Sequence, residues 1–114
     1  MIELVFGVKE KDIALVAKKI GNQLNLSFAV HDSSFKGQYY LAKEKANEYQ
    51  IMNNEMSDFD DSPEEEKEYY WQIETHKHLP TLLWFDVLPS IADKIKTLLT
   101  NSNLEIELIS EHKY

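Results

Sequence analysis

The residues with the clearest chemical potential lie in one acidic segment, residues 55–68. This segment holds eight acidic residues and one lysine, so it carries −7 of the chain's net charge of −8. Clustered carboxylates suit a calcium site, a docking surface for a basic protein, or a solvated loop. The acidic residues are Glu55, Asp58, Asp60, Asp61, Glu64, Glu65, Glu66 and Glu68.

The spacing of these acids does not fit an EF-hand calcium loop. A loop that begins at Asp58 places Pro63 where glycine is required and Tyr69 where the bidentate glutamate belongs. A loop that begins at Asp60 fails at the same two positions. We therefore expect neither a metal site nor a cofactor here, which leaves docking and a solvated loop as the alternatives.

Three aromatic residues, Tyr69, Tyr70 and Trp71, follow the acidic segment directly. Carboxylates raise the rate of association with a basic protein, and adjacent aromatic side chains can act as desolvated anchors. Two structural alternatives remain open. Ser62 and Pro63 can begin a helix whose first turn favours acids, and each aromatic side chain can instead pack in the core.

The other candidates for catalysis or metal binding are less specific. Residues 31–34 (HDSS) contain the residue types of a hydrolase triad, but triad members usually come from separated elements, so these residues predict a turn. His76 and His78 share a face only if they lie on a strand, and no third ligand has a supporting spacing. The three glycines are isolated, so the sequence has no phosphate-binding loop. We expect a protein that is not an enzyme.

The composition narrows the class of partner. All twelve basic residues are lysine, and arginine is the preferred residue for phosphate recognition, so nucleic-acid binding is disfavoured. The absence of cysteine favours a reducing compartment. The N-terminus lacks the basic region of a signal peptide, and the longest apolar run, residues 82–87, is too short to cross a membrane. We expect a cytoplasmic protein with a basic protein partner.

The elements that must position these residues follow from hydrophobic periodicity. Alternation predicts strands near residues 1–8, 27–30, 38–43, 48–53 and 104–108, and an apolar run predicts a central strand over 81–87. Helical spacing from Ile13 to Leu24 predicts one helix after an Asp12 cap, with a left-handed cap expected near Gly21 and Asn22. It predicts a second helix from Pro89 and Ser90 to residues 101–103.

This element order, β-α-β-β-β-β-α-β, predicts an α+β fold in a single domain, residues 1–114, with an acidic insert at 55–68. Two helices should cover one face of a mostly antiparallel sheet of about six strands. The expected core is ferredoxin-like, enlarged by one hairpin.

Three stretches, residues 31–40 (HDSSFKGQYY), 50–54 (QIMNN) and 80–84 (PTLLW), resemble a pattern in small bacterial proteins. Some of those proteins are similar to immunity proteins of polymorphic toxin and contact-dependent growth inhibition systems. The resemblance implies a small, acidic protein that neutralises a toxin, commonly a basic nuclease, by masking its active site. It transfers no individual functional residue, because immunity proteins diverge in the surfaces that recognise their toxins.

Three functions remain as hypotheses. The first is an immunity or antitoxin-like inhibitor in which the acidic segment and Tyr69, Tyr70 and Trp71 bind a basic toxin. The second is a small-molecule-binding or regulatory domain with a pocket between sheet and helices near residues 31–40, where His31 and Tyr39 would contact the ligand. The third is an enzyme that uses His31 or scattered acids.

Overall fold

The computed structural model describes residues 1–33, 37–54 and 79–114. Within these ranges it contains six strands and two helices in the predicted order. The elements are β1 (Ile2–Val8), α1 (Ile13–Leu24), β2 (Ala29–Ser33), β3 (Gly37–Glu44), β4 (Asn47–Asn53), β5 (Thr81–Val87), α2 (Pro89–Thr100) and β6 (Ile106–Lys113).

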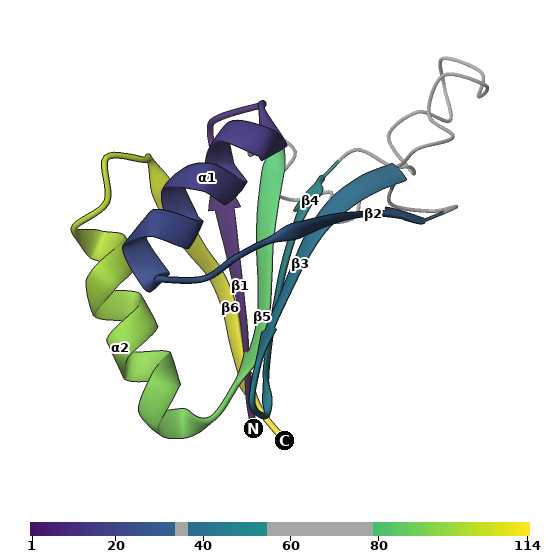
Figure 1. Ribbon diagram of the computed structural model, residues 1–114. Coiled ribbons are helices and arrows are strands. Elements are labelled where there is room, and N and C mark those ends of the chain that lie inside the picture. The colour runs from purple at the N-terminus through teal and green to yellow at the C-terminus, as the bar shows by residue number, and fades with distance from the viewer. Residues whose placement is uncertain (34–36, 55–78) are drawn as a thin grey trace, which may run out of the picture.

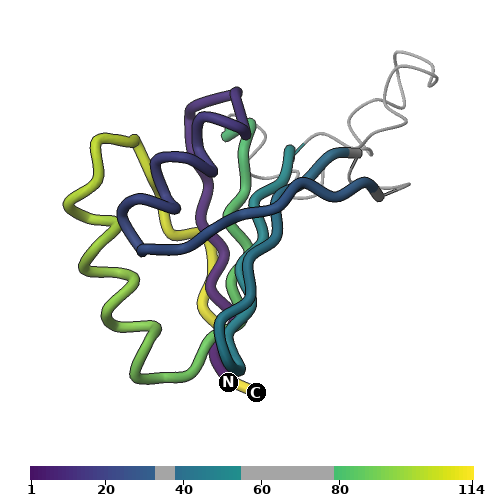
Figure 2. The backbone as a smooth tube through the Cα atoms, in the orientation of Figure 1, coloured from purple at the N-terminus to yellow at the C-terminus, as the bar shows by residue number. Residues whose placement is uncertain are grey.

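The six strands form one antiparallel sheet in the order β2-β3-β4-β5-β1-β6, and both helices lie on the same side of it (Figure 1). Strands β6, β1, β5 and β4, with α1 and α2, make up the ferredoxin-like core. The β2–β3 hairpin is the addition, inserted between α1 and β4 (Figure 2). The structure confirms the predicted α+β fold class.

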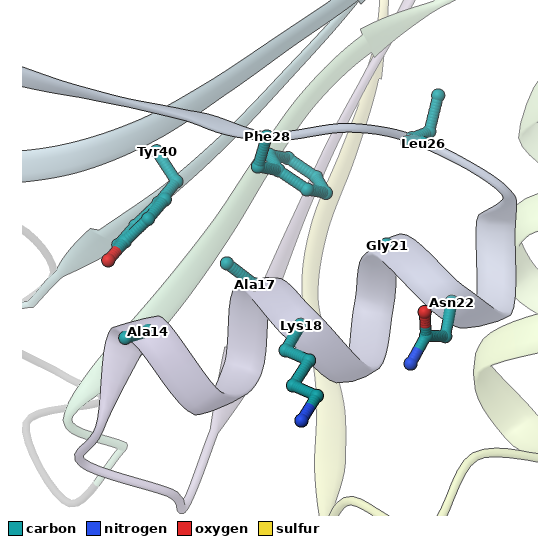
Figure 3. Close-up of a pocket in the computed structure, with 8 residues that line it drawn as sticks. All are labelled: Ala14, Ala17, Lys18, Gly21, Asn22, Leu26, Phe28 and Tyr40. Atoms are coloured by element: carbon teal, nitrogen blue, oxygen red, sulfur yellow. The ribbon is translucent and has the colours of Figure 1, made fainter.

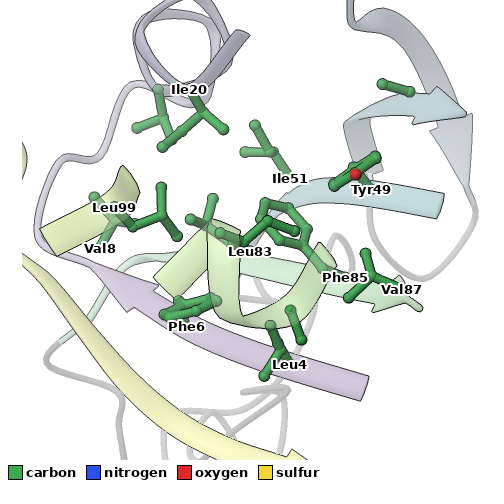
Figure 4. Close-up of a cluster of buried hydrophobic side chains, with 14 of the residues drawn as sticks. Leu4, Phe6, Val8, Ile20, Tyr49, Ile51, Leu83, Phe85, Val87 and Leu99 are labelled. Carbon is green, nitrogen blue, oxygen red and sulfur yellow. The ribbon is translucent and has the colours of Figure 1, made fainter. Parts of the chain in front are cut away.

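The core lies between the helices and the sheet. α1 packs against β3 and β4, and α2 packs against β1. Alternate residues of the central strands point into this layer, where Phe85 is fully buried and contacts Phe6 and Tyr49, with ring centroids 6.1 and 5.0 Å apart (Figure 4). Aromatic and branched apolar side chains of this kind supply most of the stabilisation by burial.

The helix caps differ in part from the sequence-based prediction. α1 ends at Leu24, and its left-handed cap is Asn25 (φ 57°), which donates its backbone N–H to the Gly21 carbonyl, in place of the expected cap near Gly21 and Asn22. α2 begins at Pro89, as predicted, and Leu88 occupies the cap position without a side-chain hydrogen bond. The predicted Asp12 cap is confirmed, since its Oδ1 accepts from the amides of Ala14 and Leu15 at 3.0 and 3.2 Å.

Two strands are displaced toward the C-terminus relative to their predictions. β2 includes His31 to Ser33, which were predicted as a turn, because β3 supplies cross-strand pairing for this stretch. β6 begins at Ile106 and continues to Lys113, because β1 offers pairing partners as far as Ile2. The predicted helix near residues 62–70 lies outside the described residues.

Candidate functional site

All of the predicted partner-binding residues lie outside the described residues, and so do His76 and His78. They belong to the segment that joins β4 to β5, and the structure describes the two ends of that connection. Asn54 is fully buried there; its backbone N–H donates to the Pro80 carbonyl (2.8 Å) and its side-chain amide to the Leu79 carbonyl (3.1 Å). These bonds extend the β4–β5 ladder beyond the pair Asn53–Thr81. Asn54, Leu79 and Pro80 therefore form a hydrogen-bonded neck at the base of the connection that contains the acidic segment.

A second acidic region lies on the sheet face opposite the helices. Glu48 of β4 is the cross-strand partner of Asp86 of β5, and Asp86 is the partner of Glu3 of β1. Lys43 of β3 and His112 of β6 lie at the two ends of this line. We call these five residues the charged row. It contains three adjacent carboxylates, each half-buried, with the lysine at one end and the histidine at the other.

The electrostatics of the charged row are unfavourable for the isolated protein, because like charges on directly opposed residues repel. Tyr114 offsets part of this cost: its hydroxyl donates to Asp86 Oδ1 at 2.8 Å. That hydrogen bond raises the pKa of Tyr114 above 10.0, and the neighbouring negative charges raise it further. The phenol therefore stays protonated and remains a donor to the row at neutral pH.

The charged row does not form a metal centre. Within residues 1–33, 37–54 and 79–114, no group of three or more His, Asp or Glu side chains is arranged to hold a metal ion. Its carboxylates are spread along a line across three strands, which suits ion pairing with several basic side chains better than the chelation of one cation. The row and the neck of the acidic segment lie at opposite ends of β4.

The pocket predicted near residues 31–40 exists in part, with a different lining. A hollow of about 290 Å³ lies between α1 and the β2–β3 hairpin (Figure 3). Phe28 extends toward α1 there, and Tyr40 of β3 forms one wall. The lining residues are Ala14, Ala17, Lys18, Gly21, Asn22, Leu26, Phe28 and Tyr40.

His31 and Tyr39 do not line this hollow. They are cross-strand partners on the opposite face of the sheet, where their rings stack with centroids 5.6 Å apart. Because side chains alternate along a strand, the neighbours Tyr39 and Tyr40 must point to opposite faces. The prediction that His31 and Tyr39 share a pocket between sheet and helices is therefore wrong, and Tyr40 takes that position.

The sequence contained signals for the residues that were missed. Asp86 interrupts an otherwise apolar run, and Glu3 and Glu48 occupy the polar positions of alternating strands. These signals mark each residue as solvent-facing. They do not reveal that β4, β5 and β1 are neighbours, which is what brings the three carboxylates together.

Comparison with known proteins adds no family assignment. No protein-family model matches this chain, and no curated protein is similar enough in sequence to count as a match. The resemblance to immunity proteins therefore stays a prediction, and the function has to be argued from the chemistry of the chain. None of the described helices is both long and apolar enough to cross a membrane.

Proposed function

We propose that this protein is a protein-binding inhibitor, an immunity or antitoxin-like protein that neutralises a basic toxin, such as a nuclease, by masking its active site. The observation that carries the proposal is the concentration of −7 charges in residues 55–68, out of a net −8. Such a segment repels itself in the free protein, and a basic partner removes that repulsion on binding.

The anchoring of the segment supports this proposal. The hydrogen-bonded neck at Asn54, Leu79 and Pro80 fixes both ends of the connection to the central strands of the sheet. A binding segment held at two fixed points loses less entropy on binding than a free tail does. The carboxylates then pair with the lysines or arginines that a nuclease uses to contact phosphate.

The charged row supplies a second negative region on the same protein. Glu3, Asp86 and Glu48 share one face of adjacent strands, and the basic side chains of the row, Lys43 and His112, lie only at its ends. Charge of this kind raises the association rate and its sensitivity to salt more than it raises affinity. In this proposal the row steers the partner, and the acidic segment with Tyr69, Tyr70 and Trp71 makes the close contacts.

The test is affinity capture of basic proteins from lysate of the source cell, first at low salt and then at raised salt. We expect stoichiometric retention of one basic protein, and weakening by salt. Neutralising the segment should abolish retention, whereas neutralising three acids elsewhere in the chain should not. The first set is Asp58→Asn, Asp60→Asn, Asp61→Asn, Glu64→Gln, Glu65→Gln and Glu66→Gln; the control set is Glu10→Gln, Asp93→Asn and Glu105→Gln. Equal retention by both sets would refute the proposal.

A second candidate function, small-molecule binding, is favoured by the hollow beside α1. Its volume of about 290 Å³ lies at the lower end of the range for ligand pockets, which suits a ligand of about one ring. A metabolite that raises the melting temperature of the wild type, but not of Tyr40→Ala, would support it. Tyr39→Ala is the matched control, because Tyr39 lies on the other face of the sheet.

A further inference from the structure

The two edges of the sheet differ in their protection against pairing with another chain. β2 and β6 are the outer strands, and no described strand pairs with the outer edge of either. Backbone N–H and C=O groups along such an edge can bind an extended segment of another protein, which is a common mode of peptide recognition. Proteins usually block this mode with charged side chains, proline or bulges.

β6 carries two of these protective features. Its sequence includes the charged residues Glu107, Glu111 and Lys113, which disfavour the approach of another strand. Its pairing with β1 is interrupted by a bulge where the register shifts between Val5 and Phe6. A bulge twists the edge and breaks the regular spacing of hydrogen-bonding groups, so β6 is a poor template for a partner strand.

β2 is less protected, because it has one acidic residue, Asp32, and no bulge in its pairing with β3. It contains neither lysine nor proline, and all five of its residues pair with β3 in one unbroken register. Val30 is 54% exposed, so a branched apolar side chain lies open to solvent on this strand. Asp32, its only acidic residue, forms no ion pair within the described parts of the chain.

Two apolar side chains and one carboxylate follow one another along the helix-facing side of the β2 edge. Val30 is the partner of Tyr40, and Phe28 and Tyr40 both line the hollow beside α1 (Figure 3). Side chains two residues apart in an extended chain share a face, so Phe28, Val30 and Asp32 follow one another along this side. A strand added at this edge therefore meets the aromatic side chains at the hollow, an exposed valine and a carboxylate in turn.

We propose that the outer edge of β2 binds an extended segment of the basic partner by adding it as a seventh strand. This segment carries two apolar side chains and one basic side chain at alternate positions. The apolar side chains lie in the hollow and beside Val30, and the basic side chain pairs with Asp32. This inference rests on the proposed partner-binding function and adds the place and mode of docking.

A second copy of this chain fits the same edge poorly. Antiparallel pairing of two β2 strands about His31 sets His31 opposite itself and Val30 opposite Asp32 of the other copy. Each carboxylate then faces an apolar side chain and gains no cation. The charge pattern of the edge therefore favours a different protein with a basic side chain over self-association.

The probe is a short, capped and fluorescently labelled peptide of alternating valine and threonine with a lysine at one end, titrated with the full chain. We expect saturable binding, monitored by fluorescence anisotropy, together with slower amide hydrogen exchange in β2 but not in β6. Val30→Lys should weaken binding by about tenfold or more. Leu108→Lys is the matched control, because Leu108 is 45% exposed on the protected edge, and it should leave binding unchanged.

Asp32→Asn is the second variant, and it should weaken binding of the lysine peptide and reduce its salt dependence while leaving the fold intact. A peptide with glutamate in place of lysine should bind more weakly to the wild type. The edge proposal is overturned by no binding, by equal losses in Val30→Lys and Leu108→Lys, or by self-association that Val30→Lys abolishes.

The outcomes for the edge and for the proposed function are separable. If the captured basic protein depends on the acidic segment but not on Val30, the edge proposal fails and the inhibitor proposal stands. If the peptide binds at β2 but no basic protein is captured from lysate, the inhibitor proposal fails and the edge remains a docking site.

Discussion

The two faces of this sheet differ in the polarity of their side chains. The helix-facing side is apolar along the central strands, where Leu4, Leu83 and Phe85 are fully buried. The opposite side changes character along the same strands. Near the neck of the acidic segment it buries apolar side chains, and at the other end it presents the three carboxylates of the charged row. The buried apolar residues of that side are Val5, Met52, Leu79 and Leu82.

This difference shows where packing requires apolar side chains and where the sheet can carry charge. The helix-facing side must be apolar along the central strands, because α1 and α2 cover it and a buried charge there would be costly. The opposite side has no such requirement at the end that holds Glu3, Asp86 and Glu48, where the side chains are half-buried. Charge is tolerated there at small cost and becomes available for a partner. Four changes would break or sharpen this comparison.

The largest effect is expected from truncating the helix-facing side of β5. Phe85→Ala removes a fully buried ring that contacts Phe6 and Tyr49, and should lower the free energy of unfolding by about 3–5 kcal/mol. Trp84→Ala, one residue away on the opposite side, should cost less because Trp84 is only half-buried. Urea denaturation of both variants measures the difference. Equal losses would show that the two faces contribute alike.

A smaller effect is expected from adding a methyl group on the opposite side. A Cβ atom at Gly7 would overlap Leu79 Cδ1 and lie 2.9 Å from Leu79 Cβ, so rotation of the Leu79 side chain alone cannot relieve the clash. Gly7→Ala should therefore destabilise the protein by about 1–3 kcal/mol. Leu79→Ala is destabilising by itself because Leu79 is buried, but the double variant should lose less than the sum of the two single losses, and a double-mutant cycle measures this coupling. Strict additivity would mean that the two side chains do not compete for space.

Alkaline pH should expose the different environments of two tyrosines. Burial, and then the charge of Glu44, raises the pKa of Tyr49 above 10.0. A raised folded-state pKa gives stability that is complete below the unfolded value and is lost as pH rises through the folded value. Tyr49→Phe should reduce this alkaline loss, as measured by melting temperature from neutral pH to above 10.0. Tyr114→Phe, on the exposed C-terminal residue, should reduce it less; the reverse order would contradict the assigned burial.

The smallest effect is expected in the charged row, and its sign is the informative part. Asp86→Asn removes the central negative charge while keeping an acceptor for Tyr114, and should raise stability by about 0.2–1 kcal/mol at low salt. Glu111→Gln is the matched control. Its carboxylate accepts from Lys96 on the helix side, so its loss should destabilise slightly. A destabilising Asp86→Asn would show that the row is compensated within the chain.

Much of the fold could be predicted from local patterns. Asp12 is a strong cap residue ahead of helical spacing, and the apolar run 81–87 correctly marked a central strand. The errors occur where pairing with a neighbouring strand overrides the local propensity of the residues. His31 and Asp32 have turn propensity, yet pairing with β3 holds them in β2. β6 continues beyond its predicted end at Leu108, because residues of β1 pair with it as far as Lys113.

The candidate site was less predictable, because its parts are distant in sequence. The acidic segment is a local feature and could be found by counting charges. Tyr40 and Tyr39 looked equivalent until the sheet assigned them to opposite faces. The hollow needed Phe28, Tyr40 and the small side chains of α1 to be placed together.

The sequence alone determined the types and order of the elements, the cap at Asp12 and the concentration of negative charge in residues 55–68. These properties follow from hydrophobic periodicity, capping and charge within a few residues, which are local interactions. The tertiary structure alone decided which strands are neighbours. It thereby aligned Glu48, Asp86 and Glu3 in one row and left β2 as the less protected edge, because strand pairing joins residues far apart in the chain that no local pattern relates.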